Sequence, residues 1–236
     1  MRLGIICAGD TEFFPFLHHL KNERIAERAM LRFHEGTIEG LETVVLYSGV
    51  CKVNAAIATQ LLIDAFHADV ILNAGTAGGV ADDVRLFDTV IADKVAYHDM
   101  ADDILTDSHP WMKSVYFHPS PELLTLAQAY SKSSAHRIRF GTAVTGEQFI
   151  DNPMRSIIRQ KYAPLSVDME TAAIAHVCYV NKIPFLSIRS ITDTPLYEGI
   201  EQFEKNCQRA SEISAEITIG LLRELRAIPG LTPTCG

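Results

Sequence analysis

Cysteine is scarce in this sequence of 236 residues, and none of its cysteines forms a metal-binding or redox motif. The five are scattered and odd in number, at Cys7, Cys51, Cys178, Cys207 and Cys235, with no CxxC pair. Neither a zinc site nor a disulfide framework is therefore indicated. Isolated cysteines of this kind are typical of buried, reduced thiols in a reducing compartment.

Long apolar runs are also missing. Only six residues separate Arg2 from Gly9 at the start of the sequence, which is too short for the hydrophobic core of a signal peptide. No run elsewhere approaches the roughly 20 apolar residues of a membrane-spanning helix. We therefore predict a cytoplasmic protein with no membrane partner.

An excess of positive charge is absent as well. The sequence has 21 Lys and Arg against 29 Asp and Glu, for a net charge of −8. A nucleic acid is an unexpected partner for such an acidic chain, because it needs a basic surface. A small nucleoside carries little charge, so the acidic total does not argue against it.

The common nucleotide-binding loops are missing too. The glycine-rich stretch GTAGG at 75–79 is not followed by Gly-Lys-Ser/Thr, and no GxGxxG occurs, which excludes a Walker loop and a dinucleotide fingerprint. The stretch is interpreted as a turn after a strand. Such a turn could be purely structural, or it could bring backbone close to a ligand.

Short apolar runs alternating with helical periodicity make up most of the sequence. We predict strands at 3–7, 29–34, 42–48, 70–73, 89–96, 139–144, 165–169 and 184–191, and helices at 12–20, 54–66, 121–130, 170–180 and 200–225. The alternation favours the α/β class, and the apolar strands favour a sheet covered on both faces. Without a linker or repeat, residues 1–236 form one predicted domain, with 226–236 as a frayed tail.

Four predicted strands end in residues that could carry chemistry. They lead into Glu12, the GTAGG stretch, Asp168-Met169-Glu170 and Asp193. Ligands of α/β sheets bind beyond the carboxyl ends of strands. A shared strand edge would therefore bring these four segments together around one ligand.

Each of these acidic residues also has a structural interpretation. Glu12 could be a first-turn helix acid, and Asp193 could form an Asx turn. For Asp168 we favour an N-cap, whereas Glu170 stays undecided. Arg189 could be an ion-pair partner. Asp168 and Glu170 would face one way only if the strand continued through both.

Seven motifs in order give the sequence a family resemblance. GIICAGDTE, YSGVCKVNAA, ILNAGTAGGV, YHD, GEQFI, VDMETAAIAHV and PFLSIRSITD resemble the bacterial 5′-methylthioadenosine/S-adenosylhomocysteine nucleosidases of the nucleoside phosphorylase superfamily. The resemblance runs from Leu3 to about Leu225. It implies a single α/β domain with a central twisted sheet, mixed or mostly parallel and flanked by helices, a homodimer, and a small nucleoside substrate.

The resemblance also implies roles for individual residues. Glu12 would be the base that activates water, Asp193 the acid that protonates adenine N7, and Glu170 the acceptor for the ribose hydroxyls. Substrate-binding positions carried over in the same way are Val50, Thr76, Gly78, Phe149 (stacking on the base), Ile150 (backbone at the base edge), Met169 (against the sugar), Arg189 and Phe203.

The implied chemistry is physically reasonable. Breaking the C1′–N9 bond places positive charge on the ribose, which a carboxylate stabilises, and negative charge on the purine, which an acid neutralises. Asp193 would need a raised pKa to be protonated. No metal or cofactor is required or suggested. Hydrolysis is favoured over phosphorolysis, because no Arg stands at 72–75 to bind phosphate, and Glu12 would repel it.

Some positions depart from the family pattern. Gly9 stands where Met is frequent, Asp168 where Glu is usual, and Thr171 where Ala is common, and residues 100–120 lack the usual apolar and aromatic pattern. We therefore expect methylthioadenosine, adenosylhomocysteine or both as substrate and leave the 5′ group open. Alternatives are a futalosine-type hydrolase, a purine nucleoside phosphorylase and a non-catalytic nucleoside-binding protein.

Overall fold

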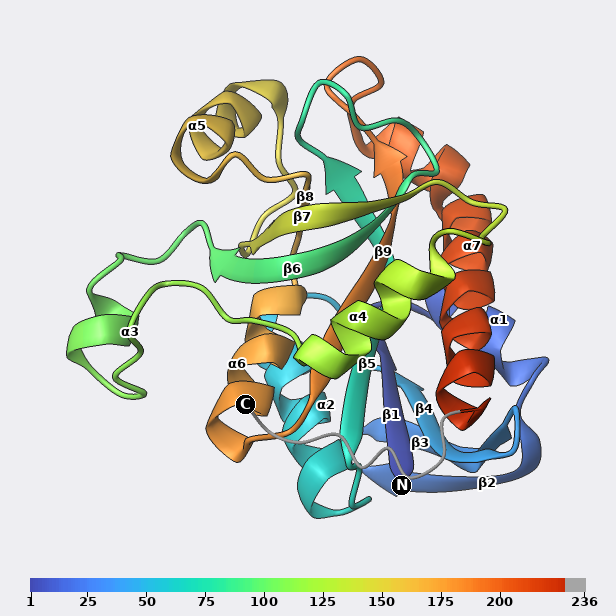
Figure 1. The fold of residues 1–236 in the computed structure, drawn as a ribbon. Coiled ribbons are helices and arrows are strands. Elements are labelled where there is room, and N and C mark those ends of the chain that lie inside the picture. The colour runs from blue at the N-terminus through green and yellow to red at the C-terminus, as the bar shows by residue number, and fades with distance from the viewer. Residues whose placement is uncertain (228–236) are drawn as a thin grey trace.

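A computed structural model describes residues 1–227 of the chain and shows a nine-stranded sheet with helices packed around it (Figure 1). The strands are β1 (Arg2–Cys7), β2 (Lys21–Arg28), β3 (Leu31–Ile38), β4 (Leu41–Tyr47), β5 (Val70–Gly79), β6 (Thr89–Tyr97), β7 (Ile138–Thr145), β8 (Ser166–Asp168) and β9 (Phe185–Asp193). The helices are α1 (Asp10–Leu17), α2 (Lys52–Asp64), α3 (Ile104–Asp107), α4 (Pro121–Tyr130), α5 (Asn152–Tyr162), α6 (Thr171–Asn181) and α7 (Ile200–Ala227).

The sheet is mixed, with the order β2-β3-β4-β1-β5-β8-β7-β6-β9. Parallel pairs join β1 to β4 and β5, β5 to β9, β6 to β7 and β7 to β8, whereas β2-β3-β4 is an antiparallel meander. An additional β5–β9 pairing closes β5, β8, β7, β6 and β9 into a ring. The predicted α/β class and mixed sheet are confirmed.

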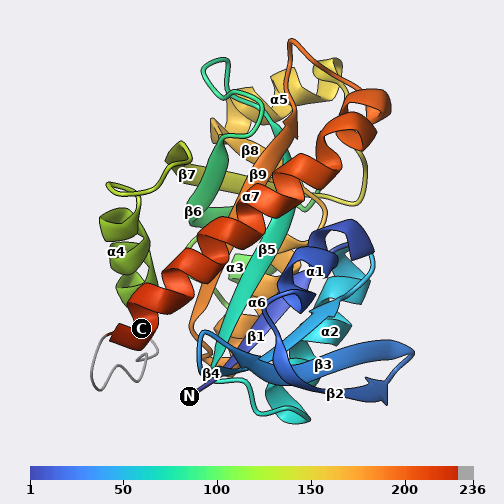
Figure 2. The same cartoon turned by 90° about the vertical axis from the view of Figure 1, so that its right-hand side faces the viewer.

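Two hydrophobic layers cover the two faces of the sheet. On β5, Ile71 belongs to a cluster that includes side chains of α2 and α6, whereas Val70 and Leu72 belong to one that includes α1, α4 and α7. Successive strand residues point to opposite faces, so a strand buried on both needs apolar residues throughout. Figure 2 shows α7 running across one face over β5 and β9.

Several elements differ from the sequence prediction. The GTAGG stretch is not a turn, because β5 continues through it to Gly79 and pairs with both β8 and β9. Strand β2 was not predicted because it is exposed along most of its length and carries no apolar alternation. Helix α5 was missed because few of its residues are apolar, although Asp151 caps it and Pro153 stands in its first turn.

The C-terminal residues also differ from the prediction. Arg226 and Ala227 form the end of α7 rather than part of a frayed tail, and residues 228–236 lie outside the described residues. Residues 100–120 are irregular as predicted, apart from the short α3. Within residues 1–227, none of the helices is long and apolar enough to cross a membrane.

Candidate active site

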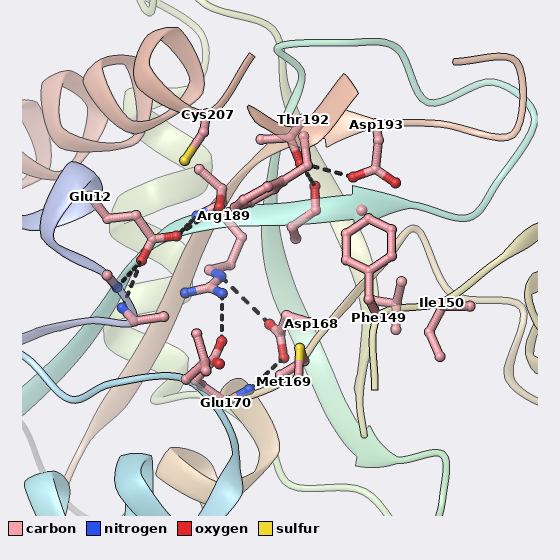
Figure 3. Close-up of a pocket in the computed structure, with 18 of the residues that line it drawn as sticks. Glu12, Phe149, Ile150, Asp168, Met169, Glu170, Arg189, Thr192, Asp193 and Cys207 are labelled. Atoms are coloured by element: carbon pink, nitrogen blue, oxygen red, sulfur yellow. Dashed lines mark hydrogen bonds and ion pairs between the residues drawn. The ribbon is translucent and has the colours of Figure 1, made fainter. Parts of the chain in front are cut away.

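A cavity of about 450 Å³ lies beside the carboxyl ends of β1, β5 and β9 (Figure 3). Residues from all four predicted strand-end segments line it, which confirms that these segments converge. Every predicted site residue belongs to the lining: Glu12, Val50, Thr76, Gly78, Phe149, Ile150, Met169, Glu170, Arg189, Phe203 and Asp193.

Glu12, in the first turn of α1, is buried in this cavity with only 4% of its surface exposed. One carboxylate oxygen accepts hydrogen bonds from the backbone N–H of Ala8 at 2.6 Å and of Gly9 at 3.3 Å. The other accepts from the backbone N–H and the hydroxyl of Thr76, both at 2.7 Å. An ionised carboxylate only accepts hydrogen bonds, so this arrangement suits Glu12 as a base.

Gly75 explains how β5 comes so close to Glu12. A Cβ atom added to Gly75 would lie 2.5 Å from the Glu12 carboxylate, well inside van der Waals contact. Only glycine therefore lets the backbone of β5 pass this close to the carboxylate and present the N–H of Thr76 to it.

Glu170 is the N-cap residue of α6, and its side chain points into the site. Its carboxylate accepts hydrogen bonds from the Arg189 guanidinium at 2.9 Å and from the backbone N–H of Cys51 at 2.9 Å. Burial raises the pKa of Glu170 to about 7; Arg189 opposes this rise, and the nearby Asp168 and Glu12 carboxylates add to it. Glu170 is thus held in place yet poorly solvated.

Arg189 crosses the floor of the site between the acidic residues. It donates to Glu170 and to the Asn73 side-chain oxygen, at 3.2 Å, and its Nε lies 3.6 Å from a carboxylate oxygen of Asp168. Burial opposes the charged form, but Glu12, Asp168 and Glu170 together raise the pKa of Arg189. Arg189 therefore fixes Glu170, which agrees with its ion-pair interpretation.

Asp168 is not the N-cap residue that the sequence favours, because Glu170 occupies that position and Asp168 ends β8, but its carboxylate still holds the start of α6. One oxygen accepts from the Thr145 hydroxyl at 2.7 Å and from the backbone N–H of Glu170 and Thr171, at 3.2 and 3.0 Å. The Thr171 hydroxyl donates to the other oxygen and accepts from the Asn73 side-chain amide at 2.7 Å. The two departures from the family pattern are thus in contact: the Thr171 hydroxyl donates to Asp168, whose side chain is one methylene shorter than the usual Glu.

Asp193 ends β9 and is almost completely buried, with 1% of its surface exposed. The Thr192 hydroxyl donates to it at 2.9 Å, and Arg155 of α5 forms an ion pair with it. Burial raises the pKa of Asp193, while Arg155 and the Thr192 hydroxyl oppose that rise. Arg155 was not predicted as a site residue because helix α5, which carries it, was not predicted. Asp151, a typical N-cap residue, was the signal in the sequence that could have located this helix.

Aromatic side chains form another part of the wall. Phe149, which is 42% exposed, meets Phe203 edge to face with ring centroids 6.3 Å apart. Ile150 and Met169 also line the cavity (Figure 3). A planar base could stack on such a surface. Gly78 faces Asp193, since an added Cβ would lie 3.2 Å from its carboxylate.

The remaining wall is open beside Gly9. A Cβ added there would meet no atom within 4 Å, so space is left where the family pattern has methionine. Val50, which is 56% exposed, also lines the cavity, as does Cys207. In residues 1–227, no cluster of three or more His, Cys, Asp and Glu side chains could hold a metal ion.

Comparison with known proteins adds independent findings. The family model described as the phosphorylase superfamily matches residues 2–223. The chain is 33% identical over 230 residues to the 5′-methylthioadenosine/S-adenosylhomocysteine nucleosidase of Bacillus velezensis, covering 95% of this chain and 100% of the relative. Its Bacillus subtilis counterpart is 32% identical with the same coverage.

Solved structures agree with these sequence matches. The nucleosidase of Streptococcus pneumoniae with a transition-state inhibitor has a TM-score of 0.86 and 30% identity, covering 95% of this chain and 100% of that one. The Colwellia psychrerythraea nucleosidase in complex with adenine has a TM-score of 0.86 and 31% identity, covering 95% and 96%. A futalosine hydrolase of Helicobacter pylori, with a TM-score of 0.86, 24% identity and coverage of 95% and 98%, shares the fold.

Proposed function

We propose an activity from one premise: this chain belongs to the phosphorylase superfamily and, within it, to the 5′-methylthioadenosine/S-adenosylhomocysteine nucleosidases. The proposed activity is hydrolysis of the N-glycosidic bond of methylthioadenosine, adenosylhomocysteine or both, releasing adenine. One observation carries it: Glu12 and Asp193 are buried in the walls of one cavity, in environments suited to a base and to an acid.

In the proposed reaction, each of the three carboxylates has its own task. Asp193 donates a proton to N7 as the C1′–N9 bond breaks and its electrons pass to the purine. Glu170 accepts hydrogen bonds from the ribose hydroxyls and stabilises the positive charge that develops on the sugar. Glu12 takes a proton from the water whose oxygen bonds to C1′. The products are adenine and the 5-thioribose.

Water rather than phosphate is the proposed nucleophile. The backbone N–H groups of Ala8 and Thr76 could have held an anion, but they already donate to Glu12. The two arginines in the lining, Arg155 and Arg189, are each paired with a carboxylate. A phosphate dianion would therefore be repelled by the charge of Glu12. The N–H groups and arginines that usually bind phosphate would already be bonded to carboxylates.

A substrate panel tests this proposal. Purified protein is incubated with methylthioadenosine, adenosylhomocysteine, aminodeoxyfutalosine or inosine, with and without phosphate, and the products are separated by chromatography. We expect adenine from one or both of the first two substrates at a rate that phosphate does not change. Phosphate-dependent formation of a ribose 1-phosphate product, or binding without turnover, contradicts the proposal.

The proposed form of the enzyme is a cytoplasmic homodimer. Exposed apolar side chains lie on neighbouring elements: Val53 and Ile57 on α2, Tyr179 and Val180 on α6, and Trp111 in the 100–120 segment. Such a surface favours association. The reduced cysteines among residues 1–227 agree with a reducing compartment. Light scattering should give about twice the 26.1 kDa chain mass, and a monomer would contradict the dimer.

A further inference from the structure

Arg155 is a buried cation in the wall of the site for which the proposed reaction has no task. Only 3% of its surface is exposed. One guanidinium nitrogen is ion-paired with Asp193, another donates to the Asn152 side-chain oxygen at 3.2 Å, and its Nε has no hydrogen-bond partner. Burying an arginine is costly unless it is paired, so its position beside the acid needs an explanation.

We propose that Arg155 is a positioning residue that holds Asp193 as a carboxylate before the base binds and releases it to take up a proton once the purine is in place. This inference rests on the proposed function, because it assumes that Asp193 is the acid. It assigns Arg155 a role in timing the protonation of Asp193.

Chain connectivity links Arg155 to the base. Helix α5 begins directly after Phe149 and Ile150, which line the cavity, and Asp151 caps it by accepting from the backbone N–H of Met154 at 3.0 Å. The Asn152 amide also donates to the Pro195 carbonyl at 3.2 Å. The first turn of α5 therefore contacts the segment that carries Asp193 at two points. A base stacking on Phe149 would displace this turn and strain both contacts.

Electrostatics determine how that displacement affects Asp193. Among the described residues, Arg155 is the charged group that acts on the Asp193 carboxylate; β9 adds the Thr192 hydroxyl, and β5 adds only Gly78. Burial raises the pKa of Asp193 and Arg155 opposes the rise. When the ion pair opens, burial acts almost unopposed, and the carboxylate takes a proton from solvent. That proton passes to N7 as the C1′–N9 bond breaks, and the regenerated carboxylate pairs again with Arg155.

The test is the pH dependence of kcat/KM for adenine release, which reports the free enzyme. Because Asp193 acts when protonated, kcat/KM falls as pH rises through its pKa. Arg155→Gln removes the cation and should move this basic limb upward by about 1–3 pH units, and Arg155→Lys by less. The matched control is Arg159→Gln, one turn further along α5, where the arginine pairs with the exposed Asp82; its limb should match the wild type.

Two further measurements separate positioning from a merely structural role. In a 4-nitrophenyl 5-methylthioriboside the leaving group is 4-nitrophenolate, which departs without protonation. The pH profile for this substrate should therefore be the same in Arg155→Gln and wild type. Calorimetry of adenine binding to the wild-type enzyme in buffers of different ionisation enthalpy should show proton uptake approaching one per site. This second measurement needs no variant to fold.

Three outcomes would overturn the inference. The first is a folded Arg155→Gln variant whose basic limb in the pH profile of kcat/KM stays at the wild-type position. The second is an equal shift of the pH profile with the purine substrate and the nitrophenyl riboside. The third is adenine binding without proton uptake. The proposed function fails separately: it is wrong if Asp193→Asn retains turnover on the purine substrate, whatever Arg155 does. An inactive Asp193→Asn together with an unmoved Arg155→Gln limb removes only the role of Arg155.

Discussion

The four buried acidic side chains of the site, Glu12, Asp168, Glu170 and Asp193, are held in two different ways. Glu12 and Asp168 accept their hydrogen bonds from neutral donors, which are backbone N–H groups and threonine hydroxyls. A buried arginine instead pairs with each of the other two, Arg189 with Glu170 and Arg155 with Asp193. The arginine-paired acids have raised pKa values because burial outweighs the ion pair.

The difference teaches how one cavity can hold a base and an acid. Backbone donors are fixed by the fold, so a carboxylate that they hold stays where a base is needed. Arg155 lies on α5 and can move with it, so Asp193 can gain a proton when this pair opens, whereas Arg189 keeps Glu170 in place. Burial raises the pKa of Asp193, which suits the acid, and the fixed hydrogen-bond donors around Glu12 suit the base.

The largest expected effects come from removing the acid or the base. Glu12→Gln and Asp193→Asn should each lower kcat for methylthioadenosine by about 10²–10⁴-fold, because each removes a proton-transfer group. The nitrophenyl riboside should separate the two variants: Asp193→Asn recovers much of its rate on it, and Glu12→Gln does not. Steady-state kinetics on both substrates, with the melting temperature as a folding check, measure this.

The same pair of variants can also break the comparison. Equal losses on both substrates would mean that Asp193 does not act as a leaving-group acid. Recovery of Glu12→Gln on the activated substrate would mean that Glu12 is not the base for water. Either result would show that the type of partner, neutral donor or arginine, does not predict whether a carboxylate acts as base or acid.

Glu170→Gln should have a smaller effect on turnover. The amide keeps one acceptor but loses the charge that would stabilise the sugar and that pairs with Arg189. Loss of a charged hydrogen bond, worth about 1.5–3 kcal/mol, predicts a decrease in kcat/KM of about 10- to 150-fold. A substrate lacking the ribose hydroxyls should show little further decrease in the variant. A full additional loss would mean that Glu170 does not contact them.

The smallest expected effect is on stability and concerns Asp168, one of the two carboxylates held by neutral donors. Thr171→Ala removes the hydroxyl that joins Asp168 to Asn73 and should lower the free energy of unfolding by about 1–3 kcal/mol. Urea denaturation measures it, with Thr171→Ser, which keeps the hydroxyl, as the control. Adding Asp168→Glu to Thr171→Ala should recover part of the loss. No recovery would show that the two positions do not compensate each other.

Prediction from sequence succeeded where side-chain pattern reports burial. Apolar runs located β1, β5 and β9 because these strands are covered on both faces, and the strand ends led to Glu12, Glu170 and Asp193. It failed for GTAGG, because glycines typical of turns here serve a strand that passes close to Glu12. It also failed for α5, because a helix on the rim needs few apolar residues.

The sequence by itself determined the α/β class, the alternation of buried strands with helices, and the acidic residues at the strand ends. Only the tertiary structure decided how each carboxylate is held, because each has at least one partner that is distant in the chain. Thr76 reaches Glu12 across 64 positions, and Arg155 reaches Asp193 across 38. Hydrogen bonds and ion pairs depend on distance and burial in space, and local sequence patterns report neither.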